Sequence, residues 1–201
     1  MNKTEIQNCL FKISHQDDAR SFKELYRYYF LKLFRFCMGI VHHKESAEEI
    51  VHNVFMNVWD KRRHLPEIEN PDVYLYVVVK NNSLDYLRKN RLKQSVDIST
   101  IDTDSFVLHI NPEQLMITEE MRKTIRQAIE QLPPRCKQIF TLIKEDGLKY
   151  KEVASILNLS VKTVEAQMAI ATKKLISAVL VYSNADSFQK RKQLFDNITS
   201  N

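Results

Sequence analysis

The sequence contains few of the residues that turn a chain sharply. Its 201 residues include only two glycines and five prolines. Strands joined by tight hairpins need more turn residues than this, so the composition argues against a β-rich fold and predicts an all-α protein. Long hydrophobic runs are missing as well. The apolar run VYLYVVV (73–79) is far too short to cross a bilayer.

Signals for export, disulfides and metal binding are also missing. The N-terminus MNKTEIQNCL lacks the apolar core of a signal peptide, so we expect a cytoplasmic protein. Cys9, Cys37 and Cys136 form no CxxC pair, which in a reducing compartment predicts small buried side chains. The histidines have no cysteine or carboxylate at ligand spacing, so the sequence predicts no metal site and no cofactor.

Charge is distributed unevenly along a chain whose net charge is only +5. The segment YLRKNRLK (86–93) holds four cations, whereas SVDISTIDTDS (95–105) holds three carboxylates and no cation. A basic patch beside an acidic segment is typical of a protein that contacts a polyanion. Cations at the C-terminal end of a helix also suit the helix dipole, so a purely structural role stays open.

Helical periodicity predicts two groups of helices separated by a linker. The expected helices span 17–40, 45–65, 73–93, 113–132, 135–146 and a pair within 153–175, with a loop at 66–72. Residues 94–112 are acidic and lack this periodicity, which predicts a linker. We therefore expect two helical domains, 1–93 and 113–182, joined by the acidic linker and followed by a polar tail, 183–201.

The stretch VASILNLSVKTVEAQMAIATKKL (153–175) has the pattern of a helix-turn-helix. Ala154 stands where the two helices cross, and Asn158 stands at a turn position that favours a left-handed backbone. Val164 occupies a buried aliphatic position, and Ser160 is a suitable N-cap for the second helix. In such motifs the N-terminal half of the second helix enters the major groove of DNA.

The outer face of this second helix is more polar than packing requires. The candidate DNA-contacting residues are Ser160, Lys162, Thr163, Glu165, Ala166, Gln167 and Ile170. Gln can pair with adenine, Glu can accept from cytosine N4, and Ala can meet the thymine methyl group. Lys162 and the amides around Ser160 suit phosphates. A helix face that is merely solvated shows the same residue types, so the motif alone leaves both interpretations open.

Four segments together resemble a known family. LPPRCKQIFTLIKEDGLKYKEVASILNLSVKTVEAQMAIATKKL (132–175) is similar to region 4 of extracytoplasmic-function sigma factors of the sigma-70 class. FKELYRYY (22–29) resembles region 2.1, AEEIVHNVFMNVW (47–59) resembles region 2.2, and YLYVVVKNNSLDYLRK (74–89) resembles regions 2.3 and 2.4. The resemblance covers residues 15 to 180 and is strongest to the Bacteroidetes-type branch.

The resemblance implies roles for the first domain. The region 2.2 helix docks on core RNA polymerase, and the matching positions are Glu48, Glu49, His52, Asn53 and Asn57. Many relatives carry Gln-Glu where this chain has His52 and Asn53. Regions 2.3 and 2.4 capture a flipped-out base of the −10 element. The matching positions, with the preceding loop, are Lys61, Arg62, Arg63, Lys80, Asn81, Asp85, Arg88 and Lys89. Tyr74 could stack on a base or simply be a buried aromatic at the helix start.

The resemblance also implies roles for the rest of the chain. Region 4 reads the −35 element, although Glu165 and Ala166 replace the Arg-Ser of many relatives, so the DNA preference is this chain's own. The acidic linker resembles a segment that threads through the polymerase, where its carboxylates either mimic nucleic acid or merely solvate a tether. The family is usually held inactive by a membrane-anchored anti-sigma factor. We expect no small-molecule ligand and a monomer when free.

The sequence therefore predicts a sigma factor that directs core RNA polymerase to promoters and catalyses nothing itself. An autonomous helix-turn-helix regulator is the alternative, and it would need a dimerisation element or a ligand pocket in residues 1–90. An enzyme acting on nucleic acid would need a metal-binding carboxylate cluster or a Gly-rich phosphate loop. Glu48 and Glu49 are adjacent on a helix and point in different directions, so they do not form such a cluster.

Overall fold

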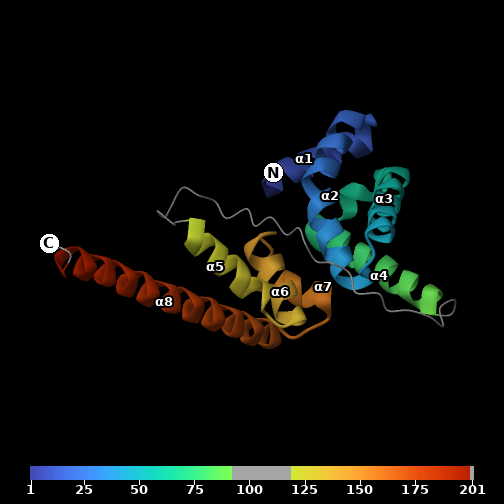
Figure 1. Ribbon diagram of the computed structural model, residues 1–201. Helices are drawn as coiled ribbons and strands as arrows, with labels where there is room; N and C mark the ends of the chain where they lie inside the picture. The colour runs from blue at the N-terminus through green and yellow to red at the C-terminus, as the bar shows by residue number, and fades with distance from the viewer. Residues whose placement is uncertain (92–118, 200–201) are drawn as a thin grey trace. The chain divides into compact units, whose positions relative to one another are not determined.

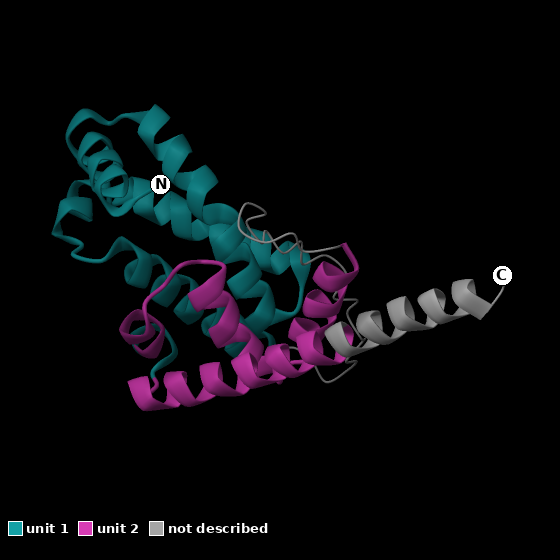
Figure 2. Ribbon diagram, turned by 90° about the vertical axis from the view of Figure 1, so that its left-hand side faces the viewer, with its two compact units in different colours: residues 1–105, 155–158 teal, residues 106–154, 159–201 magenta. Residues whose placement is uncertain are grey.

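The computed structural model describes residues 1–91 and 119–199, and the predicted linker (94–112) lies outside them. Every regular element in these described residues is a helix, which confirms the all-α prediction (Figure 1). The chain divides into two compact units, residues 1–105 with 155–158 and residues 106–154 with 159–201 (Figure 2). The domain boundaries expected from the sequence remain predictions.

The first unit is built from four α-helices and one 3₁₀ helix. These are α1 (Lys3–Gln16), α2 (Ala19–Val41), α3 (Lys44–Asp60), η1 (Arg62–Glu67) and α4 (Pro71–Arg91). Their apolar faces meet in a core whose largest fully buried side chains include Tyr29, Tyr76, Phe55, Ile13, Leu25 and Leu33. The predicted helix at 45–65 is shorter than expected, because α3 ends at Asp60 and η1 takes up part of the predicted loop.

Helix α1 is an element that the sequence analysis did not assign. The Asn2 side chain accepts from the Glu5 backbone N–H at 2.9 Å, and the Glu5 carboxylate accepts from the Asn2 N–H at 2.8 Å. This reciprocal capping box satisfies two backbone donors that a helix start leaves unpaired. The helix buries Ile6, Leu10 and Ile13 at helical spacing. Both signals are present in the sequence.

Helices α1 and α2 are joined by only two residues, Asp17 and Asp18. Asp17 adopts a left-handed backbone with φ of 50°, a conformation that Asp tolerates better than most residues. Asp18 is the N-cap of α2, and its carboxylate accepts from the Arg20 N–H at 3.0 Å and the Ser21 hydroxyl at 2.7 Å. The chain direction is therefore set tightly at this corner.

The described residues of the second unit form α5 (Glu119–Glu130), α6 (Pro134–Lys144), the beginning of α7 (Tyr150–Leu157) and α8 (Val161–Thr199). Gly147 follows α6 with φ of 80°, a left-handed conformation that glycine adopts without strain. The buried side chains include Leu132, Cys136, Ile139, Leu142, Val153, Val164, Met168 and Ala171. Helix α8 continues through residues 183–199, which the sequence analysis described as a polar tail.

The structure bears on two further predictions from the sequence, that the cysteines are buried and that the apolar runs are too short to cross a bilayer. Cys9, Cys37 and Cys136 are all buried and each carries a free thiol, as predicted. Burial raises the pKa of each thiol, so the thiols stay protonated and behave as small apolar groups. Among the helices of the described residues, none is both long enough and apolar enough to span a bilayer.

Candidate nucleic-acid interface

The turn between α7 and α8 has the geometry that the helix-turn-helix pattern predicts. Asn158 adopts a left-handed backbone with φ of 54°. The Leu159 N–H donates to the Ala154 carbonyl oxygen at 2.8 Å, which closes the end of α7. Ala154 is 5% exposed, so a small side chain is what the packing at this crossing allows. The turn is thus fixed by local hydrogen bonds and by Asn158, which tolerates the left-handed backbone.

Ser160 is the N-cap of α8. Its Oγ accepts from the Thr163 N–H at 3.0 Å and lies 2.8 Å from the Thr163 hydroxyl. The Val164 N–H donates to the Ser160 carbonyl at 3.2 Å, and the Val164 side chain is completely buried. The first turn of α8 is therefore held from both sides, by a cap and by a core contact.

The predicted DNA-contacting residues lie on one broad side of α8. The exposed ones are Ser160, Lys162, Glu165, Ala166 and Ile170, and the half-buried ones are Thr163 and Gln167. The Cys136 thiol donates to the Gln167 carbonyl oxygen at 3.2 Å, which anchors this part of α8 on α6. The exposed residues are free to meet a ligand, while the anchored backbone keeps the helix in place.

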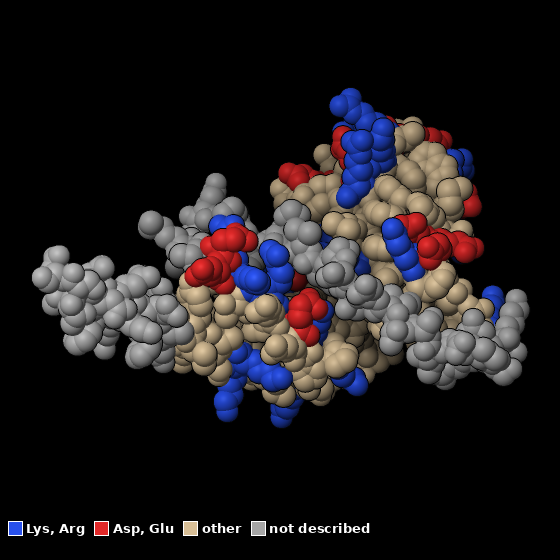
Figure 3. All heavy atoms as spheres, viewed as in Figure 1, with Lys and Arg blue, Asp and Glu red and all other residues tan. Residues whose placement is uncertain are grey.

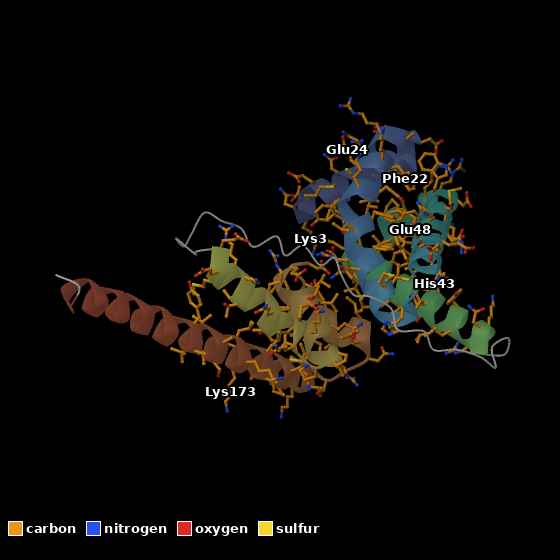
Figure 4. The ribbon with its side chains drawn as sticks, viewed as in Figure 1. Lys3, Phe22, Glu24, His43, Glu48 and Lys173 are labelled. Atoms are coloured by element: carbon orange, nitrogen blue, oxygen red, sulfur yellow. The ribbon has the colours of Figure 1, made fainter. Side chains whose placement is uncertain are left out.

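The sequence analysis missed Lys173, which continues the same face of α8. Lys162, Ala166, Ala169 and Lys173 recur at intervals of four, three and four residues, so they share one side of the helix. Figure 4 shows Lys173 pointing away from the rest of the unit. Helical spacing alone would have found it. Figure 3 shows basic side chains (blue) projecting along the first half of α8, whose other cations are Lys162 and Lys174.

A shallow depression of about 700 Å³ lies beside this face. Its lining residues are Tyr150, Glu165, Met168, Ala169, Thr172, Lys173, Ile176 and Ser177. Tyr150 begins α7 and is 37% exposed, so both helices of the motif contribute to the depression. Its lining is mostly apolar, and its charged members are one carboxylate, Glu165, and one lysine, Lys173.

In the first unit, the predicted polymerase-binding residues lie along the outer side of α3. Glu49, His52, Asn53 and Asn57 are exposed, and Glu48 is half-buried. Between them stands Met56, 59% exposed, which the sequence analysis missed because it counted only polar residues. An exposed apolar side chain within a polar helix face is typical of a protein-binding surface.

His52 is supported by an aromatic residue of α2. Its Nε2 lies 2.8 Å from the Tyr26 hydroxyl, and the two rings are inclined by only 14°. Burial, and then the Glu48 carboxylate, raise the pKa of Tyr26, so its hydroxyl stays protonated and can donate to His52. The imidazole is therefore held in one orientation at the surface of α3.

The loop before α4 presents its cations unequally. Lys61 and Arg63 are exposed, whereas Arg62 is half-buried. The Arg62 Nη1 donates to the Trp59 carbonyl oxygen at 3.0 Å, and its Nε pairs with the Asp17 carboxylate. The three neighbouring cations of the sequence prediction thus fall into two kinds, two that are open to a ligand and one that is held inside the unit.

Helix α4 carries the remaining predicted −10 residues. Asn81, Asp85 and Arg88 are exposed at helical spacing on one face, and Asp85 pairs with Arg88 at 2.7 Å. Lys89 is exposed as well, and Lys80 is half-buried.

At the start of α4, the Asn70 side chain accepts from the Val73 N–H at 3.2 Å, and the Asp72 carboxylate accepts from the Tyr29 hydroxyl at 2.7 Å. Tyr74 is half-buried, so its ring contacts the unit and still reaches the surface. The start of α4 is therefore tied to the core, and the residues that point outward sit on a rigid base.

Comparisons with known proteins agree with this arrangement. Residues 25–93 match sigma-70 region 2, and residues 122–175 match sigma-70 region 4. The ECF RNA polymerase sigma-E factor of Escherichia coli K12 is 33% identical over 113 residues, which cover 53% of this chain and 59% of that protein. The chain therefore spans little more than half the length of this relative. The ECF RNA polymerase sigma factor SigW of Bacillus subtilis is 23% identical over 158 residues, which cover 75% of this chain and 84% of SigW.

Two solved structures share the fold. CnrH, determined in complex with the cytosolic domain of CnrY, has a TM-score of 0.51 at 17% identity and covers 89% of this chain and 98% of its own. The sigma factor RpoE of Bartonella quintana, determined with the anti-sigma factor NepR, has a TM-score of 0.55 at 18% identity and covers 81% and 99%. The chain thus belongs to the extracytoplasmic-function group of the sigma-70 family, with a region 2 and a region 4.

Proposed function

We propose that the protein joins core RNA polymerase and directs it to promoters that carry matching −35 and −10 elements. The observation that carries the proposal is the exposed polar face of α8, presented after a capped turn. In a helix-turn-helix this face enters the major groove. The protein supplies recognition in the cytoplasm and catalyses no reaction, because RNA synthesis belongs to the polymerase.

In the second unit, we assign the reading of base edges to Glu165, Ala166 and Gln167. Lys162 and Lys173 lie on the same face and would neutralise phosphates on either side of those contacts. The remaining predicted −35 contacts are Ser160, Thr163 and Ile170. Because the phosphate contacts carry no sequence information, the choice of promoter would rest on the first three residues.

In the first unit, we assign the capture of an unpaired −10 base to Asn81 and Asp85 of α4. The cations that would hold the DNA backbone are Lys61, Arg63, Lys80, Arg88 and Lys89. Opening the duplex costs about 1–2 kcal/mol of stacking energy at each base step. The captured bases and the polymerase together must offset this cost, because a chain with a net charge of only +5 binds duplex DNA weakly alone.

The outer side of α3 is the proposed docking surface for core RNA polymerase, through Glu48, Glu49, His52, Asn53 and Asn57. Met56 would be its apolar centre, since apolar anchors surrounded by polar residues dominate protein interfaces. RpoE was solved with an anti-sigma factor, which supports an inhibitory partner for this chain too. We propose a membrane-anchored anti-sigma factor that competes for such faces, a monomer when free, and no small-molecule ligand.

Transcription in vitro tests the proposal directly. Core RNA polymerase from the source organism is incubated with a pool of genomic promoters, with and without the protein, and start sites are mapped. Discrete start sites that require the protein are expected, and they would reveal both promoter elements together. Duplex binding by the protein alone, without any polymerase-dependent start, would instead support an autonomous helix-turn-helix regulator.

A further inference from the structure

Arg62 differs from its two neighbours because two nitrogens of its guanidinium are already engaged within the first unit. Its Nε pairs with the Asp17 carboxylate in the corner between α1 and α2. Its Nη1 donates to the Trp59 carbonyl at 3.0 Å, at the end of α3. Its guanidinium carbon also lies 4.8 Å from the centre of the Trp59 ring, within the range of a cation–π contact. The Arg62 side chain is only 25% exposed.

The two partners of Arg62 stand on fixed backbone. Asp17 sits in a two-residue corner whose other member, Asp18, caps α2, so its backbone is held in place although its side chain is 59% exposed. The Trp59 ring packs on Phe22 of α2 with ring centres 4.9 Å apart. Arg62 therefore ties η1 to the α1–α2 corner and, through Trp59, to α2 and α3.

The 3₁₀ helix that follows needs such an anchor. A 3₁₀ helix has poorer hydrogen-bond geometry than an α-helix, and η1 also contains Pro66. No side chain among the described residues caps its N-terminus. Its other ties are the buried Leu65, which is 3% exposed, and the Ser14 hydroxyl of α1, which donates to the Arg63 carbonyl at 3.3 Å. Without Arg62, the first residues of η1 would lose their only charged anchor within the described part of the chain.

We propose that Arg62 is a positioning residue rather than a DNA contact. It locks the turn between α3 and η1, so that Lys61 and Arg63 are presented to the promoter in a fixed arrangement. A phosphate contact made by a preordered cation does not pay the conformational entropy of ordering its loop at the moment of binding. Asp17 and α1, which lie before the residues matched to region 2, thus become part of the promoter-opening apparatus.

The direction in which one substitution changes promoter binding separates this role from direct DNA contact. Asp17→Asn removes the carboxylate that holds Arg62 while keeping a residue that tolerates the left-handed backbone. If Arg62 contacted phosphates, freeing it and removing one negative charge beside it would strengthen promoter binding. If Arg62 positions the loop, the same change weakens binding and opening. Asp60→Asn is the matched control, because it removes the same negative charge at an exposed position two residues before Arg62 in the sequence.

The inference rests on the proposed function, so wild-type protein must first give polymerase-dependent start sites. Open complexes are then quantified from the permanganate reactivity of unpaired thymines with the full chain and core polymerase. We expect Asp17→Asn to reduce open complexes about two- to fivefold relative to Asp60→Asn, as for the loss of a partly exposed ion pair. Equal or greater opening by Asp17→Asn would overturn the positioning role.

Salt dependence provides a second readout. The salt slope is the magnitude of the fall in log affinity with log salt concentration. Removing one phosphate contact to duplex DNA reduces this slope by about 0.9. We expect Arg63→Gln to lower this slope and Arg62→Gln to lower affinity with the slope unchanged. Arg62→Lys should not restore affinity, because Lys lacks the planar fork that makes three contacts at once. A lowered slope for Arg62→Gln would also overturn the inference.

The free protein tests the anchor without polymerase or DNA. In thermal unfolding, Asp17→Asn and Arg62→Gln should each lower the stability of the first unit, and the double variant should be no less stable than Arg62→Gln alone. Such non-additivity is expected of two residues that act through one contact. Additive losses would show that the pair is not coupled. The unfolding experiment tests the coupling of Asp17 and Arg62 even if the protein proves not to start transcription.

Discussion

The N-cap of α8 is a single hydroxyl that holds the first turn of the helix proposed to read the −35 element. Ser160→Ala removes the oxygen that accepts from the Thr163 N–H at 3.0 Å and leaves that donor without its partner. Loss of a serine N-cap costs about 1 kcal/mol. For a unit of this size, that loss lowers the midpoint of thermal unfolding by about 4–8 °C. Because α8 carries the proposed −35 contacts, fraying of its first turn should also weaken promoter binding.

The matched control is Ser177→Ala, which makes the same chemical change in the same helix. The Ser177 hydroxyl donates to the Lys173 carbonyl at 2.9 Å and caps nothing, so its loss should be nearly neutral. Hydrogen exchange of the Thr163 amide reports the cap directly and should accelerate about fivefold in Ser160→Ala. Ser160→Thr should restore protection. Equal exchange and equal thermal midpoints in Ser160→Ala and Ser177→Ala would refute the capping argument.

Four further predictions follow from other parts of the structure. Asn158→Val should destabilise the second unit by about 1–2 kcal/mol in thermal unfolding, whereas Asn158→Gly should not, because a β-branched residue is strained at a φ of 54°. Met56→Ala should weaken binding to core RNA polymerase in a pull-down titration without changing the thermal midpoint, since its side chain is exposed. Lys173→Gln should lower the salt slope of promoter binding by about 0.9 while leaving the order of preferred promoters unchanged. Hydrogen bonds from the Ser21 hydroxyl and the Arg20 N–H hold the pKa of Asp18 below its usual 3.8. That stabilisation is therefore complete above pH 4 and is lost as acid protonates the folded carboxylate, and Asp18→Asn should flatten the dependence of the thermal midpoint on pH below 4.

The features that the sequence predicted correctly are those set by residues close together in the chain. Asn158 and Ser160 adopt the conformations expected of them, because a left-handed turn or an N-cap depends on the next three or four residues. The stripes of α2 and α5 were recognised for the same reason, since helical periodicity is a local pattern. Capping boxes are equally local, so the Asn2 and Glu5 pair could have identified α1.

The features that the sequence did not predict depend on contacts between distant segments. Asp17 and Arg62 are 45 residues apart, and neither neighbourhood indicates that the other is close. Arg62 was grouped with Lys61 and Arg63 because the three are consecutive cations, yet only the fold decides which of them is engaged. The shortened α3 has a similar cause. Its periodicity continues past Asp60, but the packing of Leu65 beneath α1 favours a 3₁₀ turn there.

His52 shows how a departure from a family pattern can be compensated by a residue that no motif includes. An exposed imidazole in place of an amide would be a poor interface residue if its ring moved freely, because ordering it on binding costs entropy. Tyr26 removes that cost by holding the Nε2 at 2.8 Å, and Phe30 lies 5.5 Å from the same ring. The proposed docking surface of α3 therefore extends onto α2. Tyr26→Phe should weaken polymerase binding through His52, and the same change in a His52→Ala background should have little further effect.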